Sequence, residues 1–345
     1  MPATQLLYCN EPPAAHYEAL FLDLDGVCYL GAQPAPHAPE GLEKAKSLGA
    51  KTVYITNNSS RTPRTVAAHL SRIGIPTAEE EVVNSALTTA KQLGEYLPAG
   101  ARVLVIGGAG VQEAVAEAGY ETVSDADTDP VAVVQGLAEN VGWAELSEAV
   151  LAIKKGALYF ATNLDATLPK ERGEMIGNGS LVAAVVNATG KTPVSAGKPD
   201  RYIYNYAKIH SGFENVLAVG DRLNTDIAGA VNAGIPALHV LTGVSRARDV
   251  LLAEPDERPN FLALDLSDLA RPMPRVFKDG DVWRCAGHCA AVTQGTVVTD
   301  GSAMPGVILP NSYRAAAAAV WEYLDNGGKR ENLRLPAQIT VVRGE

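Results

Sequence analysis

Several features are scarce in this sequence, and each scarcity excludes a class of protein. Four cysteines among 345 residues are too few for a disulfide framework, so we expect a reduced, cytoplasmic protein. Lysine and arginine number 29 against 39 aspartates and glutamates, and the resulting net charge of −10 argues against nucleic acid or an anionic membrane as partner. No apolar run is long enough to cross a bilayer. The first thirteen residues lack the basic start and apolar centre of a secretory signal.

The composition and the order of elements indicate a globular α/β protein. The chain is 47% hydrophobic and 20% charged, and its length suggests two or three domains. A buried strand over 19–22 is followed by a helix at 40–48, a strand at 51–55 and a helix at 63–73. This alternation is typical of a parallel sheet covered by helices on both faces.

The middle of the chain predicts a second α/β unit inserted into the first. A helix is expected over 83–97, further strands and helices follow, and the glycines at 177 and 179 mark the return to the first unit. After about residue 270 the pattern changes to short strands at 282–284 and 291–298 and an alanine-rich helix at 313–324. We therefore predict a doubly wound core (1–82 and 179–270), an inserted α/β domain (83–178) and a small α+β C-terminal extension (271–345).

Polar residues stand at three expected strand ends. Asp23 and Asp25 follow the first apolar strand, Thr56 follows the second, and Asp221 follows a later one, Val216–Val219. In open parallel sheets ligands bind outside the carboxyl ends of the strands, so these side chains are well placed for chemistry. Taken alone, the first pair reads equally well as two acidic residues that open a surface loop.

Together these residues suit phosphoryl transfer. Asp23 and Asp221 can bridge Mg²⁺, which prefers one or two carboxylates with water and phosphate oxygens. The Thr56 hydroxyl and the Asn57 backbone N–H can hold phosphate oxygens, while Lys198, in a Gly-Lys-Pro turn, adds a fixed positive charge.

The two neighbouring aspartates then have separate roles. Asp23 attacks phosphorus and forms an aspartyl-phosphate. Asp25 protonates the leaving alkoxide and later takes a proton from the attacking water. Asp226, near the start of a helix, either orients the metal's water shell or Lys198, or caps that helix.

Four motifs in order resemble those of the haloacid-dehalogenase (HAD) phosphatase superfamily. Within residues 19–245 they are Asp23-Leu24-Asp25-Gly26-Val27, Thr56 to Arg61, Gly197-Lys198-Pro199, and Gly220 to Ile227. The insert resembles the α/β cap of the NagD-like, 4-nitrophenylphosphatase subgroup, on Thr162-Asn163-Leu164-Asp165 and Gly177 to Ser180. The fuller pattern, with the C-terminal extension, resembles actinobacterial glycerol 3-phosphate phosphatases.

The resemblance implies a Mg²⁺-dependent phosphatase that acts on a small phosphomonoester, with glycerol 3-phosphate as the leading substrate. Phosphoglycolate, pyridoxal phosphate, sugar phosphates and nucleotides stay open, as do a phosphotransferase and a non-catalytic phosphometabolite-binding protein. It also implies that the Asp25 carbonyl is a metal ligand beside Asp23 and Asp221. We expect Asn58 to help bind phosphate and Asn224 to support the metal site.

Several residues of the cap are further candidates for a functional role. Asn163, Asp165 and Trp143 are candidates for substrate choice, and Trp143 stands where relatives usually have tyrosine; packing on a helix face is the favoured alternative for it. Glycines at 107, 108 and 110 predict a tight strand-to-helix turn rather than a nucleotide loop.

The C-terminal extension contains a cluster of Cys285, His288 and Cys289, which is expected to pack rather than bind zinc. A homodimer through the cap or the extension is possible.

Overall fold

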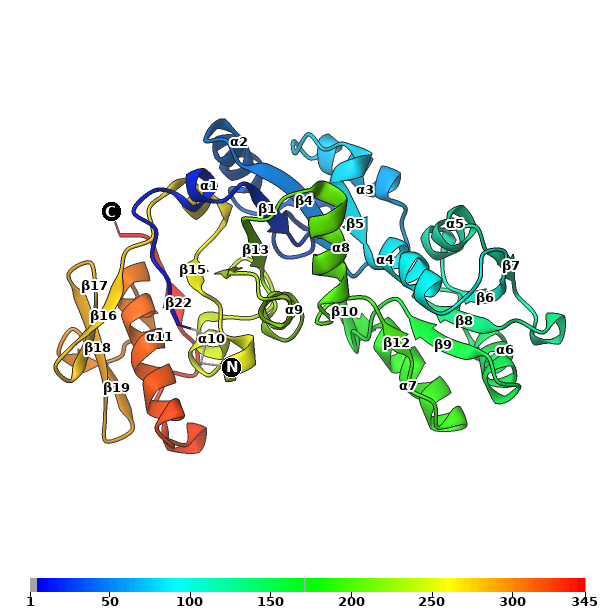
Figure 1. Cartoon of the computed structure of the whole chain (residues 1–345). Helices are drawn as coiled ribbons and strands as arrows, with labels where there is room; N and C mark the ends of the chain where they lie inside the picture. The colour runs from blue at the N-terminus through cyan, green and yellow to red at the C-terminus, as the bar shows by residue number, and fades with distance from the viewer. Residues whose placement is uncertain (1–4, 171, 345) are drawn as a thin grey trace. The chain divides into compact units, whose positions relative to one another are not determined.

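The structure is a computed structural model that describes residues 5–170 and 172–344, and its chain divides into two compact units (Figure 1). The first unit contains Met1–Thr52 and Phe213–Glu345. The second contains Val53–Gly212.

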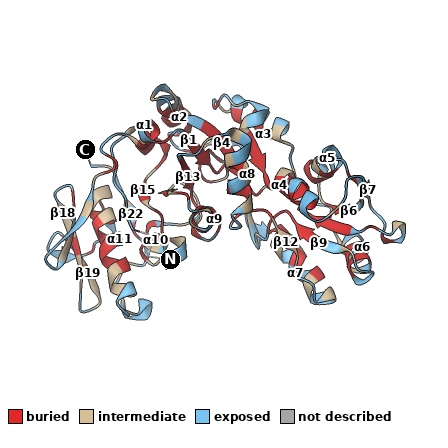
Figure 2. Cartoon of the chain, in the orientation of Figure 1, coloured by how far each residue is buried: buried red, intermediate tan, exposed pale blue. Residues whose placement is uncertain are grey.

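A parallel sheet forms the centre of the first unit, in the order β15-β14-β13-β1. All residues of these four strands are buried, as expected for a parallel sheet covered on both faces (Figure 2). Leu22 pairs with Val219, so the residues that follow β1 and β13 leave the sheet at the same edge. The strands are β1 (Ala19–Leu22), β13 (Val216–Gly220), β14 (Ala237–Val240) and β15 (Phe261–Ala263).

Short helices and two small strand pairs complete this part of the first unit. The predicted helix after Asp221 begins as a π-turn, Leu223–Ile227, which continues directly into α9. The helices are α1 (Pro13–His16), α2 (Ala38–Ser47), α9 (Ala228–Ala233) and α10 (Ala247–Leu251), and the pairs are β2 (Tyr29–Leu30) with β3 (Gln33–Pro34) and β21 (Val307–Ile308) with β22 (Thr340–Val341).

The C-terminal extension is an antiparallel sheet packed against helix α11 (Pro310–Asp325). Five consecutive alanines, 315–319, are buried in this helix, and their small side chains permit close packing. The predicted strand at 291–298 is instead a hairpin, because Gln294 and Gly295 both adopt positive φ and turn the chain. The strands are β16 (Val276–Asp279), β17 (Val282–Cys285), β18 (His288–Thr293), β19 (Thr296–Thr299) and β20 (Ser302–Ala303).

Contacts of Trp321 and Asp325 join α11 to the rest of the first unit. The indole N–H of Trp321 donates a hydrogen bond to the carbonyl of Val250, at 2.9 Å. The guanidinium of the buried Arg258 lies over the Trp321 ring and donates to Asp325 Oδ2 at 2.8 Å. The extension is therefore packed as part of this unit.

The second unit contains a five-stranded parallel sheet, in the order β12-β9-β8-β6-β7. Alternate residues of β6 pack into two hydrophobic clusters: Val103 and Val105 into one, Leu104 and Ile106 into the other. Helices α4 and α5 contribute to the first cluster and α6 and α7 to the second, so both faces of the sheet are covered. The strands are β6 (Arg102–Ile106), β7 (Glu121–Val123), β8 (Ala132–Gln135), β9 (Leu158–Ala161) and β12 (Val194–Ser195).

The remaining elements of the second unit surround this sheet. Strand β4 (Lys51–Thr56) begins in the first unit and pairs in parallel with β5 (Val82–Asn84). Strands β10 (Thr167–Lys170) and β11 (Gly173–Ile176) form a hairpin. The helices are α3 (Pro63–Arg72), α4 (Ser85–Gln92), α5 (Ala109–Glu117), α6 (Trp143–Lys154), α7 (Asn178–Thr189) and α8 (Tyr202–Ser211).

Two details of the second unit differ from the sequence prediction. The segment expected as one helix over 83–97 starts as strand β5, because its buried valines pair with β4, and Asn84 then caps helix α4 by accepting a hydrogen bond from Leu87 N–H. The inserted sheet also continues past the turn at Gly177, since β12 pairs with β9.

Within the described residues, no helix is long and apolar enough to cross a membrane.

We predict that Arg258→Ala destabilises the first unit by about 2–4 kcal/mol, because it removes a buried cation from Trp321 and Asp325. Equilibrium urea unfolding, followed by tryptophan fluorescence, measures the change. The control is Arg284→Ala, whose ion pair with Asp279 is exposed and whose loss should cost less than about 0.5 kcal/mol. Equal losses of stability in the two variants would contradict the conclusion that the contacts of Arg258 hold the extension to the rest of the first unit.

Candidate active site

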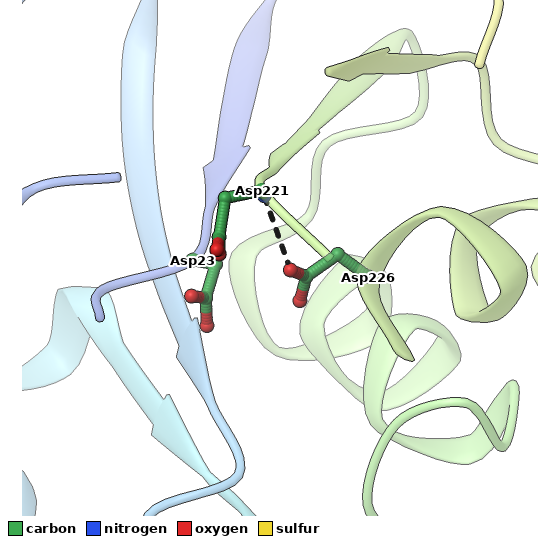
Figure 3. Close-up of side chains that lie close together, drawn as sticks. All are labelled: Asp23, Asp221 and Asp226. Carbon is green, nitrogen blue, oxygen red and sulfur yellow. Dashed lines mark hydrogen bonds between the residues drawn. The ribbon is translucent and has the colours of Figure 1, made fainter. Parts of the chain in front are cut away.

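Three carboxylates gather where strands β1 and β13 end. Asp23 follows β1, Asp221 follows β13, and Asp226 projects from the π-turn that comes next (Figure 3). One oxygen of each lies within 4.8 Å of the other two. Their exposed fractions are 9%, 0% and 2%. Among the residues that the structure describes, no other group of three metal-ligating side chains lies this close together.

The Asp221 loop is held by hydrogen bonds from several directions. Asp221 Oδ2 accepts from the Val244 N–H at 2.6 Å. Asp226 Oδ2 accepts from the N–H groups of Asp221, at 3.2 Å, and Arg222, at 3.0 Å. Asp226 thus ties down the main chain beside Asp221 and also belongs to the carboxylate group. The sequence left open whether Asp226 supports the metal site or caps the helix. Asp226 lies within the helical segment, and its hydrogen bonds go to the N–H groups of residues that precede that segment, so it is not an N-terminal cap.

Glycines make room for these carboxylates. A Cβ on Gly243 would lie 2.0 Å from Asp221 Oδ2, and one on Gly26 would lie 2.6 Å from Asp221 Cγ. Gly26 also has a φ of +90°, which disfavours any other residue at this turn. The sequence indicated Gly26 as a turn but gave no sign that it clears space for a carboxylate from another strand.

This arrangement suits a hard divalent cation. Carboxylate oxygens are the donors that Mg²⁺ prefers, and Asp23 and Asp221 present theirs from neighbouring strands. Without a cation, three like charges this close together repel one another. The glycines that clear the surroundings of Asp221 support the same interpretation. The residues present therefore fit a magnesium site.

Asp25 lies in the turn after β1. One of its oxygens accepts a hydrogen bond from the Tyr29 hydroxyl at 3.3 Å. The Cys28 thiol donates to the carbonyl of Asp23, also at 3.3 Å, and the Thr242 hydroxyl donates to the carbonyl of Gly26 at 2.6 Å. These contacts fix the turn that carries Asp25, and sequence reasoning identified none of the three donors.

His239 is a further residue that sequence reasoning missed. It lies in β14, is fully buried, and its Nε2 is 3.0 Å from the carbonyl oxygen of Asp221. Burial lowers the pKa of His239 to about 4, so the imidazole is neutral near pH 7. The sequence showed only a lone histidine in an apolar strand, which gives no signal for such a contact.

In the second unit, Asn57 holds the main chain of Lys198. Its Oδ1 accepts from the Lys198 N–H at 2.8 Å, and its Nδ2 donates to the Lys198 carbonyl at 3.0 Å. Lys198, which is 3% exposed and precedes a cis-proline, donates from Nζ to the carbonyl of Ile55 at 3.1 Å. Thr56 Oγ1 accepts from the Asn58 N–H at 3.0 Å. The structure thus brings Lys198 to the loop that contains Thr56 and Asn57, from which it is far apart in the sequence.

Two of the expected cap residues bind this same loop. Asn163 Nδ2 donates to the carbonyl of Asn57 at 2.8 Å, and Asp165 accepts from Asn57 Nδ2 at 3.1 Å. Asn58 Oδ1 accepts from the N–H and hydroxyl of Ser60. The cap is therefore tied to the loop after β4 by side chains that the sequence suggested only for substrate choice.

Two other expected site residues are exposed. Asn224 lies in the π-turn between Asp221 and Asp226, with its side chain in an exposed position. Trp143 is the first residue of α6 and is 86% exposed. The favoured prediction that Trp143 packs on a helix face is therefore wrong, because the first turn of α6 presents this side chain to solvent.

The glycine-rich segment at 107–110 and the cluster of Cys285, His288 and Cys289, which the sequence also indicated, both lie close to other residues of their own unit. Gly110 is the second residue of α5, and a Cβ there would lie 2.5 Å from the carbonyl oxygen of Ser59, so this glycine permits a close approach of the helix to the loop after β4. In the extension, Cys285 is buried with its Sγ 3.8 Å from Asn311 Oδ1, and His288 Nδ1 lies 3.0 Å from Asp300 Oδ2.

We predict that Gly243→Ala weakens Mg²⁺ binding at least about tenfold, because the new methyl group displaces the Asp221 carboxylate. Titration calorimetry of the full chain with MgCl₂ measures this change. The control is Gly306→Ala, since the nearest atom to that Cβ is 3.5 Å away, an ordinary contact. Unchanged affinity in the Gly243 variant would contradict the assignment of this site.

Two family models match the chain in the segments that carry these residues. A haloacid dehalogenase-like hydrolase model matches residues 20–121, and a HAD-hydrolase-like model matches residues 195–269. The first covers the strands that lead to Asp23 and Thr56, and the second covers Lys198 and Asp221.

Known proteins match over most of the chain. It is 41% identical to a D-glycerol 3-phosphate phosphatase of Mycobacterium tuberculosis over 320 residues, 90% of this chain and 87% of the relative. It is 37% identical to an acid sugar phosphatase of Staphylococcus haemolyticus over 254 residues, 73% of this chain and 95% of the relative.

Solved structures agree with these matches. A glycerol phosphate phosphatase of M. tuberculosis in complex with magnesium superposes with a TM-score of 0.81 at 38% identity, covering 97% of this chain and 95% of the other. A p-nitrophenyl phosphatase of Archaeoglobus fulgidus gives 0.68 at 30% identity, covering 74% and 98%. The strand-end carboxylates, the two family models and these matches together show that the chain belongs to the haloacid dehalogenase-like hydrolases, among the NagD-like and p-nitrophenylphosphatase members.

Proposed function

We propose that this phosphatase hydrolyses a small phosphomonoester, glycerol 3-phosphate above all, through an aspartyl-phosphate on Asp23. The observation that carries the proposal is the buried group of Asp23, Asp221 and Asp226, at the strand ends where the family motifs begin. Matches to phosphatases over most of the chain support it.

Thr56, Asn57 and Lys198 are assigned to binding the oxygens of the substrate's phosphoryl group. Support comes from the two family models, one of which matches the segment that carries Asp23, Thr56 and Asn57 and the other the segment that carries Lys198 and Asp221.

Magnesium would be held by the carboxylates of Asp23 and Asp221 and by the backbone carbonyl of Asp25. When bound, it neutralises charge on the phosphoryl oxygens and orients them. Asp226 holds the Asp221 loop in place through its bonds to backbone N–H groups. Asn224 faces solvent in the same turn and would support the water around the metal.

The reaction proceeds in two steps on this chain's own side chains. Asp23 attacks phosphorus, the ester P–O bond breaks, and Asp25 gives its proton to the leaving alkoxide. Asp25 then takes a proton from water, and the resulting hydroxide attacks phosphorus, releases Asp23 and forms inorganic phosphate. Lys198 and the Thr56 hydroxyl stabilise the phosphoryl oxygens in both steps, with Asn57 and Asn58 shaping the loop that binds them.

Glycerol 3-phosphate is preferred because the match to the glycerol phosphatase covers 90% of this chain, whereas the match to the acid sugar phosphatase covers 73%. A sugar phosphate is the second candidate, supported by that second match. The presence of both Asp23 and Asp25 favours catalysis over mere binding of a phosphometabolite, since binding alone needs no proton donor. The acidic, cysteine-poor composition supports a cytoplasmic setting. We also propose a homodimer that forms through the cap or the extension.

We expect Asp23→Asn to lower phosphate release from glycerol 3-phosphate at least about 10³-fold, because an amide is a poor nucleophile. A phosphate-release assay over glycerol 3-phosphate, phosphoglycolate, pyridoxal phosphate, sugar phosphates and nucleotides makes the comparison. The exposed Asp279→Asn is the control and should retain full activity. Turnover by the Asp23 variant would overturn the nucleophile assignment, whereas wild-type preference for a sugar phosphate would overturn only the substrate.

Removal of divalent metal should abolish activity, because Asp23 carries a negative charge that repels the phosphate ester. The protein is treated with excess EDTA, desalted and assayed with and without added MgCl₂. Activity should return on addition of Mg²⁺. Full activity in the metal-free sample would rule out the proposed role of the carboxylate group.

Trp143→Ala should lower kcat/KM for the preferred substrate about tenfold through KM, because we assign this exposed side chain a substrate contact in the cap. Its melting temperature should be unchanged, since an exposed residue contributes little to packing. Leu151→Ala, on the same helix and 50% exposed, serves as the control. If both variants keep wild-type kinetics, Trp143 has no part in substrate choice.

A further inference from the structure

His239 occupies an unusual place for a polar side chain. It lies in β14, whose residues are otherwise alanine, leucine and valine, and all of them are buried. Parallel register pairs it with Gly220, the residue before Asp221. A histidine therefore stands in the middle of the apolar sheet, next to the strand end that carries the carboxylate group.

The hydrogen bond of His239 shows which of its two ring nitrogens carries the proton. Its Nε2 lies 3.0 Å from the carbonyl oxygen of Asp221, and a carbonyl can only accept, so Nε2 carries the proton and donates it. The other ring nitrogen, Nδ1, is buried and has no hydrogen-bond partner among the described residues. Leaving this nitrogen without a partner costs stability, so packing alone does not account for a histidine here.

The hydrogen bond from His239 is one of several hydrogen bonds that hold Asp221 in place. The Asp221 carbonyl also accepts from the Ser245 N–H at 3.1 Å, so both of its lone pairs are used. The Asp221 N–H donates to Asp226, and its carboxylate accepts from Val244. His239 is the one side chain in this set that reaches the Asp221 carbonyl from a neighbouring strand of the sheet.

We infer that His239 is a positioning residue for the metal site: its Nε2–H fixes the peptide after Asp221 and thereby aims the Asp221 carboxylate at the cation. This inference rests on the proposed function, in which Asp221 binds Mg²⁺. His239 itself touches neither the cation nor the substrate.

Three variants of the full chain test the inference. His239→Leu fills a similar volume without a donor, His239→Gln places an amide N–H near the position of Nε2, and Leu238→Met is a volume-conserving control in the same strand. Titration calorimetry gives the dissociation constant for Mg²⁺, and thermal unfolding in EDTA gives the metal-free melting temperature.

We expect His239→Leu to weaken Mg²⁺ binding about tenfold, with a metal-free melting temperature equal to or above that of the wild type. His239→Gln should bind Mg²⁺ within about threefold of wild type, and Leu238→Met should match wild type. A leucine variant that binds Mg²⁺ as tightly as wild type, or a glutamine variant as weak as the leucine variant, would overturn the inference. Absence of Mg²⁺ binding by the wild type would instead overturn the proposed function.

A measurement on the wild-type protein tests the inference about His239 if the leucine variant does not fold. Nitrogen-15 NMR of the histidine side chains reports the tautomer of His239, and the inference requires the Nε2–H form, whose signals shift when Mg²⁺ is added. A proton on Nδ1, or signals of His239 that do not respond to Mg²⁺, would overturn it.

Discussion

Repulsion among three buried carboxylates is the constraint on which the rest of the site depends. At an effective dielectric constant of about 20, two unit charges separated by the 4.8 Å limit found for Asp23, Asp221 and Asp226 repel by roughly 3.5 kcal/mol. Apolar packing gives no reason to collect such charges at the end of a buried sheet. A divalent cation does, because it converts the repulsion into coordination and draws in the phosphate of a substrate.

The surroundings of the cluster are organised to maintain this arrangement. Glycines at 26 and 243 leave room for the Asp221 carboxylate, and backbone N–H groups bond to Asp221 and Asp226. In the second unit the side-chain amide of Asn57 hydrogen-bonds to both backbone groups of Lys198 and so fixes the main chain of the lysine. In both units, hydrogen bonds to the main chain of the charged residue help to fix its position.

The sequence was sufficient for the α/β fold and for the grouping of Asp23 with Asp221, because each follows a continuous apolar run and parallel strands end at one edge. It was insufficient where the outcome depends on which side chains meet in three dimensions. The hydrogen bond from His239 to the carbonyl of Asp221, which follows the neighbouring strand, leaves no local pattern in the sequence. Neither do the hydrogen bonds between the Asn57 side chain and the main chain of Lys198. Trp143 shows the same limit, since helical spacing cannot tell whether a first-turn residue meets a neighbour or solvent.

The central claim is that the carboxylate cluster enables Asp23 to accept a phosphoryl group. Rapid acid quench of the Asp25→Asn variant with ³²P-labelled p-nitrophenyl phosphate and Mg²⁺, followed by peptide mass spectrometry, tests it most directly. The nitrophenolate leaves without a proton from Asp25, so the variant keeps the first step but lacks the base that activates water for the second. The account predicts a phosphoryl group on the peptide that contains Asp23, and none when Asp23→Asn is added to the variant. Label on another residue, or phosphate release by the Asp25 variant at the wild-type rate without any labelled peptide, would contradict it.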